Sequence, residues 1–351
     1  MKRRDTGRAP ALVAALAVAA AGAGCALVPP TAGRGEAVNL ALAGDLAYVA
    51  LGEAGLGIYD LEARRMVAVL APEAGAGSVD DLAVADGLLF ALDARTPGYL
   101  TTYALAEPSR PRRTAPPLPV PVEPFSGVSA SAGRVVVSGG TKPLTLATYG
   151  ADGALSVTAT TDLGRGQPDV LVAPGGALAF VSTHFSLVRA TYGVTALALD
   201  GAPRALSRIE IDGAGFTPGA AKPANFALET ALAGSALLVA SGAGLSVLDA
   251  SDPAALRQLA HLTLPVRPVN VDTEGGLAAL VGSDPSPTLV LVDVSEPARP
   301  ALVAALPLPP GASPTAVALD RRRIVVAARA AGVLVVNRDA AAPAQAARAR
   351  D

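Results

Sequence analysis

The sequence predicts an all-β protein, a seven-bladed β-propeller of four-stranded blades. The first observation behind this prediction is a repeat, because one apolar run recurs seven times at intervals of 44 to 50 residues. The runs end at Asp60, Ala104, Gly150, Asp200, Asp249, Asp293 and Asn337. This interval is the length of a propeller blade, in which four strands of about 5–6 residues are separated by turns.

Turn chemistry and composition separate a propeller from other repeat folds. A Gly or Pro interrupts the β-type runs every few residues, which excludes helical repeats. Gly-Asp, Asp-Gly or Gly-Gly pairs join the first two runs of many copies, as in VNLALAGDLAYVAL from Val38, and are hairpin signals. A β-helix has a shorter repeat, and WD40 blades carry a Trp-Asp pair, whereas this chain has no Trp.

The sixth copy shows how each blade is expected to be built. Its first two strands are VNVDTEGGLAALVG from Val269, its third is LVLVD ending at Asp293, and its outer strand is ALVAALPLP from Ala301. The third strand is apolar throughout because neighbouring blades cover both of its faces. Asp293 and Ser295 are expected to end it by bonding to nearby backbone N–H groups, and Pro297 prevents it from continuing.

The amino-acid sequences of these copies resemble a known family. The phrases LVLVDVSEPARPALVAALPLP and LSVLDASDPAALRQLAHLTLP are similar to the LVIVD repeats of exported bacterial β-propellers, which run LVIVDVSDPANPVLVG. The match is close in copies five and six, recognisable in copies one and seven, and weak in copies two to four. The resemblance implies a binding or surface module outside the cytoplasm and carries over no catalytic residue, so Asp249 and Asp293 are interpreted as structural.

Residues 1–24 are predicted to be a lipoprotein signal peptide. A basic start, MKRRDTGR, precedes an apolar stretch that is short for a membrane span. Cys25, the only cysteine, follows Ala23 and Gly24, which resembles the lipobox of bacterial lipoproteins, although Gly22 stands where Leu is usual. An ordinary cleaved signal peptide is the alternative. We expect an exported protein that is anchored to the cell envelope by lipid on Cys25. Ala26 after the cysteine, rather than Asp, resembles lipoproteins sorted to the outer membrane, which implies that location here.

The rest of the chain divides into residues 25–37, a lipidated Cys and tether, residues 38–338, the propeller, and residues 339–351, a flexible tail. The tail is poor strand material, so the seventh blade lacks an evident outer strand. The segment ALVPP at Ala26–Pro30 is a candidate to supply it and thereby remove an exposed edge. The alternative is a long tether and a three-stranded last blade.

Charge and motifs narrow the possible functions. A net charge of -2 without a basic stripe argues against nucleic acid as a partner. The two histidines, His184 and His261, lie in separate copies and cannot make a zinc site with a single cysteine. Phosphate-binding, nucleophile-elbow and calcium-loop motifs are absent from the sequence. We therefore expect no catalytic residue, no metal and no cofactor.

Two insertions in the fourth copy are the main departure from the repeat. STHFSLVRATYG at Ser182–Gly193 stands where the fifth copy has SGAG, and DGAGFTPGAAKPANF occupies Asp212–Phe226. Both are expected on one face of the ring, where exposed aromatic and basic side chains commonly anchor a partner. The predicted binding residues are His184, Phe185, Arg189, Tyr192, Phe216 and Lys222. The alternative is a pair of surface loops that pack only on themselves.

Polar residues at the starts of the innermost strands form a second candidate site. They are Asn39, Asp80, Asp81, Asp169, Asn225 and Asn270. Several are expected to line the central channel, where they would either hold a cation or satisfy backbone donors and ordered water.

These observations favour a non-catalytic, lipid-anchored interaction module that binds a protein or glycan through its loop face. An exported enzyme, such as a lyase, hydrolase or oxidoreductase, with its site at the channel mouth is one alternative, and a purely structural envelope protein is another. The fold alone does not separate them. An enzyme would require His184, Arg189 and an acid such as Asp169 or Asp80 to converge in a deep pocket.

Overall fold

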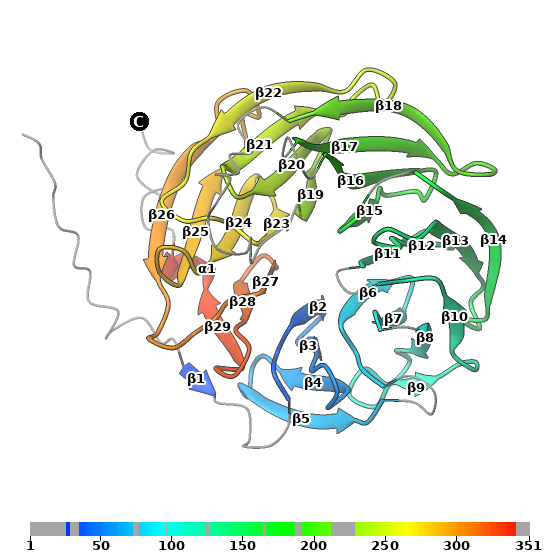
Figure 1. The fold of residues 1–351 in the computed structure, drawn as a ribbon. Helices are drawn as coiled ribbons and strands as arrows, with labels where there is room; N and C mark the ends of the chain where they lie inside the picture. Colours follow the sequence, from blue (N-terminus) through cyan, green and yellow to red (C-terminus); the bar gives the residue numbers. More distant parts are fainter. Residues whose placement is uncertain are drawn as a thin grey trace, which may run out of the picture.

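The computed structural model of the protein describes residues 26–28, 35–72, 77–95, 97–123, 126–163, 166–186, 191–211 and 229–341. These residues form seven antiparallel sheets arranged as blades around one axis, as Figure 1 shows. The prediction of a seven-bladed, all-β propeller is confirmed. In the described ranges one short helix, α1 (Arg338–Ala341), is present, and no helix there is long and apolar enough to cross a membrane.

Each blade runs outward from the ring axis in chain order, with the seventh completed from the N-terminus. The innermost strands are β2 (Asn39–Ala43), β6 (Asp81–Ala85), β11 (Val128–Ser131), β15 (Val170–Val172), β19 (Glu229–Ala233), β23 (Asn270–Glu274) and β27 (Ala316–Leu319). The second strands are β3 (Leu46–Ala50), β7 (Leu88–Asp93), β12 (Arg134–Val137), β16 (Leu178–Ser186), β20 (Ala236–Ser241), β24 (Leu277–Gly282) and β28 (Arg323–Ala327). The third strands are β4 (Leu56–Asp60), β8 (Gly98–Ala104), β13 (Leu144–Tyr149), β17 (Thr191–Ala198), β21 (Gly244–Asp249), β25 (Thr288–Asp293) and β29 (Val333–Asn337).

The outer strands are less regular than the inner ones. They are β5 (Arg65–Leu70), β14 (Leu155–Thr161), β18 (Arg204–Glu210), β22 (Arg257–Leu262), β26 (Ala301–Pro307), and in the second blade two short pieces, β9 (Arg112–Arg113) and β10 (Leu118–Val120). In five blades the pairing of the third and outer strands shifts register once, as between Leu291 and Val292. Such a bulge increases the local twist of the sheet.

Packing between blades explains the apolar third strands. In β25 the side chains of Leu289 and Leu291 pack against the seventh blade, whereas those of Val290 and Val292 pack against the fifth. All four are fully buried. The expectation that neighbouring blades cover both faces of this strand is confirmed, and burial of this kind is the main stabilising term in a fold with few aromatic residues.

Short acceptor side chains end these strands as expected. Asp293 Oδ1 accepts bonds from Ser295 N at 3.0 Å and from Ser295 Oγ at 2.6 Å. Asp249 and Ser251 repeat both bonds, and the guanidinium of Arg257 lies 2.7 Å from the other carboxylate oxygen of Asp249. These contacts support the structural interpretation of both aspartates.

The ring is closed by a strand from the N-terminal end of the chain. β1 (Ala26–Val28) pairs antiparallel with β29, with Ala26 opposite Val335 and Val28 opposite Val333. The seventh sheet therefore has the order β1-β29-β28-β27, so the first of the two alternatives for its outer strand is the one adopted. The arrangement joins both ends of the propeller in one blade.

Candidate functional site

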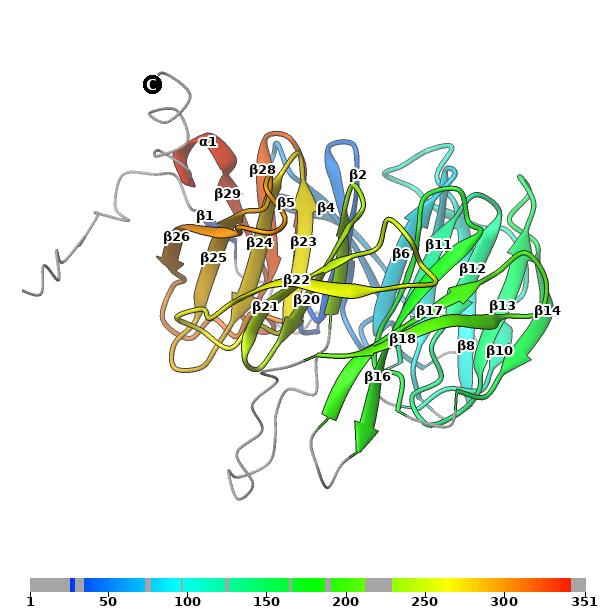
Figure 2. The same ribbon diagram turned by 90° about the horizontal axis from the view of Figure 1, so that it is seen from above.

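The fourth blade carries the longest hairpin of the ring. Its strands β16 and β17 contain 9 and 8 residues, whereas the second strands of the other blades contain 4 to 6. Pairing continues through His184 opposite Tyr192 to Ser186 opposite Thr191. Figure 2 shows this hairpin extending beyond the other blades on one face of the ring, which we call the hairpin face.

The six predicted binding residues are only partly within the described structure. His184 and Phe185 belong to β16, and Tyr192 belongs to β17. The ring of Tyr192 is half-buried against the core between blades 4 and 5, and this burial raises the pKa of its hydroxyl. Arg189, Phe216 and Lys222 lie outside the described residues. The binding role of the six residues stays a prediction.

The second insertion leaves the ring beside this hairpin. Ile211, the last described residue before it, donates its N–H to the carbonyl oxygen of Tyr192 at 2.9 Å. Both insertions of the fourth copy therefore begin on the same face of the ring.

Exposed ion pairs mark the loops between second and third strands on the hairpin face. Lys142 Nζ lies 3.1 Å from Glu123 Oε1, and Arg329 Nη1 lies 3.2 Å from Glu36 Oε2. Similar pairs join Arg95 to Glu53 and Arg267 to Asp284. Because these groups are solvated, each pair contributes little to stability. Their effect is to leave this part of the face polar and nearly neutral.

The predicted channel residues hold neighbouring blades together. The innermost strand of each blade has a strand on one side only, so its inner edge exposes N–H groups that need acceptors. Asp81 Oδ2 accepts from Val128 N at 2.7 Å, and Asp169 Oδ2 accepts from Thr230 N at 3.0 Å. Asn270 Oδ1 accepts from Val317 N at 2.9 Å.

Two other predicted channel residues have different contacts. Asn39 donates its side-chain amide to Asp81 Oδ1 in the next blade. Asp80 bonds within its own blade, to Ser78 Oγ and to the backbone N–H of Ala94. Asn225 lies outside the described residues. Of the two interpretations offered for the channel set, these contacts support the satisfaction of polar donors.

Glu229 is another polar residue at the start of an innermost strand, and the sequence interpretation missed it. It starts β19 and accepts a bond from the side-chain amide of Asn270 at 3.2 Å. Its position could have been found by counting, because it lies five residues before the hairpin glycine Gly234, as Asn39 lies five before Gly44. The third blade has Gly127 at the equivalent place, where a Cβ would approach both Asp81 Oδ2 and Asp169 Oδ1 within 3.5 Å.

Burial gives these acids unusual proton affinities. It raises the pKa of Asp81 to about 7 and that of Asp169 to about 6, and backbone donors to Asp81 oppose the increase. The pKa of Glu229 is raised well above its ordinary value by burial and by the charges of Asp169 and Asp81. The described residues contain no group of three or more His, Cys, Asp or Glu side chains placed to hold a metal ion.

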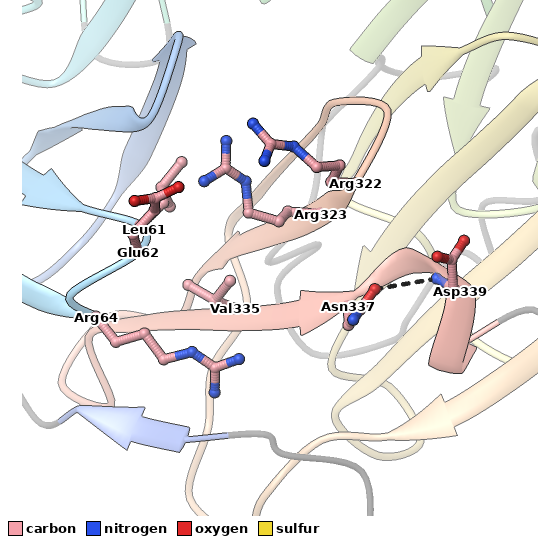
Figure 3. A pocket seen from close by; sticks show the side chains of 8 residues that line it. All are labelled: Leu61, Glu62, Arg64, Arg322, Arg323, Val335, Asn337 and Asp339. Carbon is pink, nitrogen blue, oxygen red and sulfur yellow. Dashed lines mark hydrogen bonds between the residues drawn. The ribbon is translucent and has the colours of Figure 1, made fainter.

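A pocket of about 310 Å³ lies on the opposite face, where blades 7 and 1 meet, and we call it the seam pocket. It is lined by Leu61, Glu62, Arg64, Arg322, Arg323, Val335, Asn337 and Asp339. Figure 3 shows its three arginines approaching from both blades around β29. The sequence interpretation assigned no role to these residues.

Comparison with known sequences identifies the repeat. The LVIVD repeat matches residues 34–61 and 283–306, which belong to the first and sixth blades. The chain carries LVIVD repeats. No match was found among curated proteins.

Solved structures similar to this LVIVD-repeat chain show the fold alone. The structure of U3-55K has a TM-score of 0.62 at 12% identity and covers 89% of this chain and 97% of its own. The RRP9 WD40 repeats give 0.61 at 13% identity, covering 89% and 96%. The computationally designed Ika8 protein gives 0.57 at 10% identity, covering 90% and 100%.

Proposed function

We propose that this protein is an exported, lipid-anchored β-propeller of the bacterial cell envelope that acts as a non-catalytic interaction module. It binds a protein or glycan partner through its hairpin face. Its anchor is the lipid on Cys25, in the outer membrane. Of the two alternatives, a purely structural envelope protein would have no partner that depends on the hairpin.

The projecting hairpin of blade 4 carries this proposal. The pairing of β16 with β17 continues past the ring, so residues around His184 and Tyr192 belong to an ordered element. Binding to an element that is already ordered costs less conformational entropy than binding to a loop that must become ordered. Three of the six predicted binding residues, His184, Phe185 and Tyr192, belong to the two strands.

The position of β1 supports the anchor. Cys25 directly precedes Ala26, the first residue of the closing strand. A lipid on this cysteine would hold the ring at its seam, close to the membrane, without a long tether. Palmitate labelling of the full chain and of Cys25→Ser tests this part, because incorporation is expected in the first and none in the second.

The hairpin is tested by in-cell cross-linking of the tagged full chain, followed by identification of the captured protein or glycan. In the variant, residues 184–192 are replaced by a two-residue Gly-Ser turn. Thr183 and Gly193 are opposite each other, so they become the closing pair of a two-residue hairpin and the ring is expected to stay folded. The control replaces Gly242 and Ala243, the turn of blade 5 on the same face, by Gly-Ser.

We expect a partner that is captured by the native chain and by the control and is lost in the shortened hairpin. Capture that survives the shortening would contradict binding through this hairpin. Absence of any partner in all three chains would favour a purely structural envelope protein.

An exported enzyme remains the second candidate because of the acids beside the ring axis. A pKa of about 7 for Asp81 and about 6 for Asp169 suits general acid–base catalysis near neutral pH. Their oxygens, however, accept bonds from the adjacent blades, which accounts for their positions without a substrate. An activity abolished by Asp81→Asn in a folded ring would favour the enzyme.

A further inference from the structure

The seam pocket combines the guanidinium groups of three arginines with an apolar floor. The side chains of Leu61 and Val335, both buried to 2% exposure, form part of its wall. Three guanidinium groups and the carboxylates of Glu62 and Asp339 complete the charged lining of the pocket. Its volume of about 310 Å³ is enough for a small polar group.

The arginines of blade 7 are held in place but keep donors for a ligand. Arg323 is 12% exposed and is fixed by Asp320 Oδ2 at 2.9 Å and Asp45 Oδ1 at 2.8 Å. Arg322 is 71% exposed and reaches the same oxygen of Asp45 at 3.4 Å. In the described part of the chain, no hydrogen bond or ion pair uses the Nη1 group of either arginine.

A phosphate group matches this arrangement. Guanidinium groups offer pairs of N–H donors whose spacing fits phosphate oxygens, and such charge-assisted bonds are among the strongest in proteins. Arg322 and Arg323 of blade 7 supply these donors, and Arg64 of blade 1 also lines the pocket, on the other side of the strand that carries Val335 in the view of Figure 3. The apolar wall on one side strengthens these electrostatic contacts by excluding water.

The closing strand indicates where such a phosphate comes from. Ala26 of β1 is opposite Val335, which lines the pocket, and Cys25 directly precedes Ala26 in the sequence. Consecutive Cα atoms are about 3.8 Å apart, so a lipid on Cys25 would place the pocket at the level of the membrane headgroups. Basic side chains are attracted to anionic lipid surfaces, which favours the same orientation.

We propose that the seam pocket binds the phosphate group of an anionic phospholipid headgroup. The phosphate site is inferred from the side chains that line the pocket. Its assignment to a lipid headgroup rests on the proposed lipid anchor at Cys25. The propeller then sits with its seam-pocket face against the membrane. The hairpin of blade 4, which extends from the opposite face, points away from the membrane toward a partner.

Native mass spectrometry of the full chain in a neutral detergent tests the proposal. Phosphatidylglycerol or phosphatidylcholine is added, and retained lipid is counted on the folded protein. The pocket variant is Arg64→Gln with Arg322→Gln. The control, Arg95→Gln with Arg267→Gln, removes two arginines from exposed ion pairs on the hairpin face and so makes the same change in charge.

We expect the native chain and the control to retain phosphatidylglycerol in preference to phosphatidylcholine, and the pocket variant to lose this retention by at least about tenfold. Equal losses of phosphatidylglycerol in the two variants, or no loss in either, would overturn the proposal that the seam pocket binds the lipid phosphate. Titration with glycerol 3-phosphate distinguishes the source, because binding of this compound without retention of phosphatidylglycerol would overturn the headgroup assignment.

Two measurements keep a failed variant interpretable. Thermal unfolding reports whether the pocket variant is folded, and Arg322→Gln alone, at a side chain 71% exposed, is the milder substitute with a smaller expected loss of lipid in the same direction. The mass of the chain itself reports whether Cys25 carries a lipid. Failure of the proposed anchor is therefore seen separately from failure of the pocket.

Discussion

At the residue scale, aspartates at the ends of third strands are structural groups. Asp293 accepts two bonds from Ser295 and so completes the turn that leads to the outer strand. The local pattern of an apolar run, an aspartate, a serine and a proline was enough to predict this role from the sequence, because all partners lie within a few residues of one another.

Removal of that acceptor should weaken the fold. We expect Asp293→Ala to lower the free energy of unfolding by about 1 kcal/mol, since two donors of Ser295 lose their protein partner. Urea denaturation measures the change, and Asp293→Asn, which keeps one acceptor oxygen, should lose less. A stable Asp293→Ala protein that no longer binds its partner would contradict the structural role.

The acids beside the ring axis show what the sequence could not provide. The sequence shows the acids themselves, and it correctly places Asp81 and Asp169 where innermost strands begin. Their bonds to Val128 and Thr230 depend on how one blade meets the next, 47 and 61 positions along the chain. The raised pKa values arise from the same geometry and have no local sequence signal.

These acids make stability depend on pH. A carboxyl whose pKa is higher in the folded state binds its proton more tightly there, so its stabilising effect is fully present below about pH 4 and is lost as pH rises through the folded value. Because the pKa of Asp81 is raised to about 7 and that of Asp169 to about 6, the free energy of unfolding should be larger at pH 5 than at pH 8. Urea denaturation at the two values measures the difference.

Glu229 is the clearest single test of this coupling. Glu229→Gln keeps an acceptor for Asn270 but removes a charge near Asp169 and Asp81, so we expect it to stabilise the protein at pH 8 by on the order of 1 kcal/mol. The exposed Glu296→Gln removes the same charge elsewhere and should have little effect. Destabilisation by Glu229→Gln at pH 8 would show that the acids do not repel one another.

At the element scale, turns before the outer strands also join neighbouring blades. Tyr48, in the second strand of blade 1, donates its hydroxyl to the carbonyl oxygen of Pro108 in blade 2 at 2.8 Å. Ser207 in blade 4 makes the same kind of contact with Pro253 in blade 5 at 2.6 Å. The proline of the repeat thus ends a strand and also supplies an acceptor to the preceding blade.

A pair of tyrosines isolates the value of such a contact. Tyr48 and Tyr59 are both buried in blade 1, but within the described structure the hydroxyl of Tyr59 has no hydrogen-bond partner. We expect Tyr48→Phe to lower the free energy of unfolding by about 1 kcal/mol and Tyr59→Phe to leave it unchanged or raise it. Equal effects in urea denaturation would show that the bond to Pro108 contributes nothing specific.

The fourth blade shows where element prediction from the sequence stopped. Its insertion at Ser182–Gly193 was expected as a loop, but the structure continues β16 and β17 into it, with His184 opposite Tyr192. Its β-branched and aromatic residues, such as Thr183, Phe185 and Thr191, can extend a hairpin that has already been started by the buried strands. Length alone did not distinguish a long hairpin from a long loop.

At the scale of the whole molecule, closure of the ring brings the two ends of the propeller together. The number of blades followed from the repeat interval, because each blade has its own third strand. The closing strand was left as one of two alternatives, since three residues carry no repeat pattern of their own. Only the pairing of Ala26–Val28 with β29 decides between them.

A disulfide across the seam tests this closure. Val28 and Val333 are opposite each other, and opposite Cα atoms in antiparallel strands are about 4.5–5.5 Å apart, which is within the range that a disulfide bridges. We expect Val28→Cys with Val333→Cys, in a Cys25→Ser background, to oxidise readily. The bond would close a loop of most of the chain and stabilise the protein by up to about 5 kcal/mol.

The register of the pair makes the result specific. In the control, Val28→Cys is combined with Val335→Cys, which is opposite Ala26 and so two positions away from Val28. Non-reducing electrophoresis should show a bridged chain in the first variant and much less in the second, and urea denaturation should show stabilisation that disappears on reduction. Equal bridging in both variants would mean that β1 is not held in this register, and the argument that places Cys25 beside the seam pocket would fail with it.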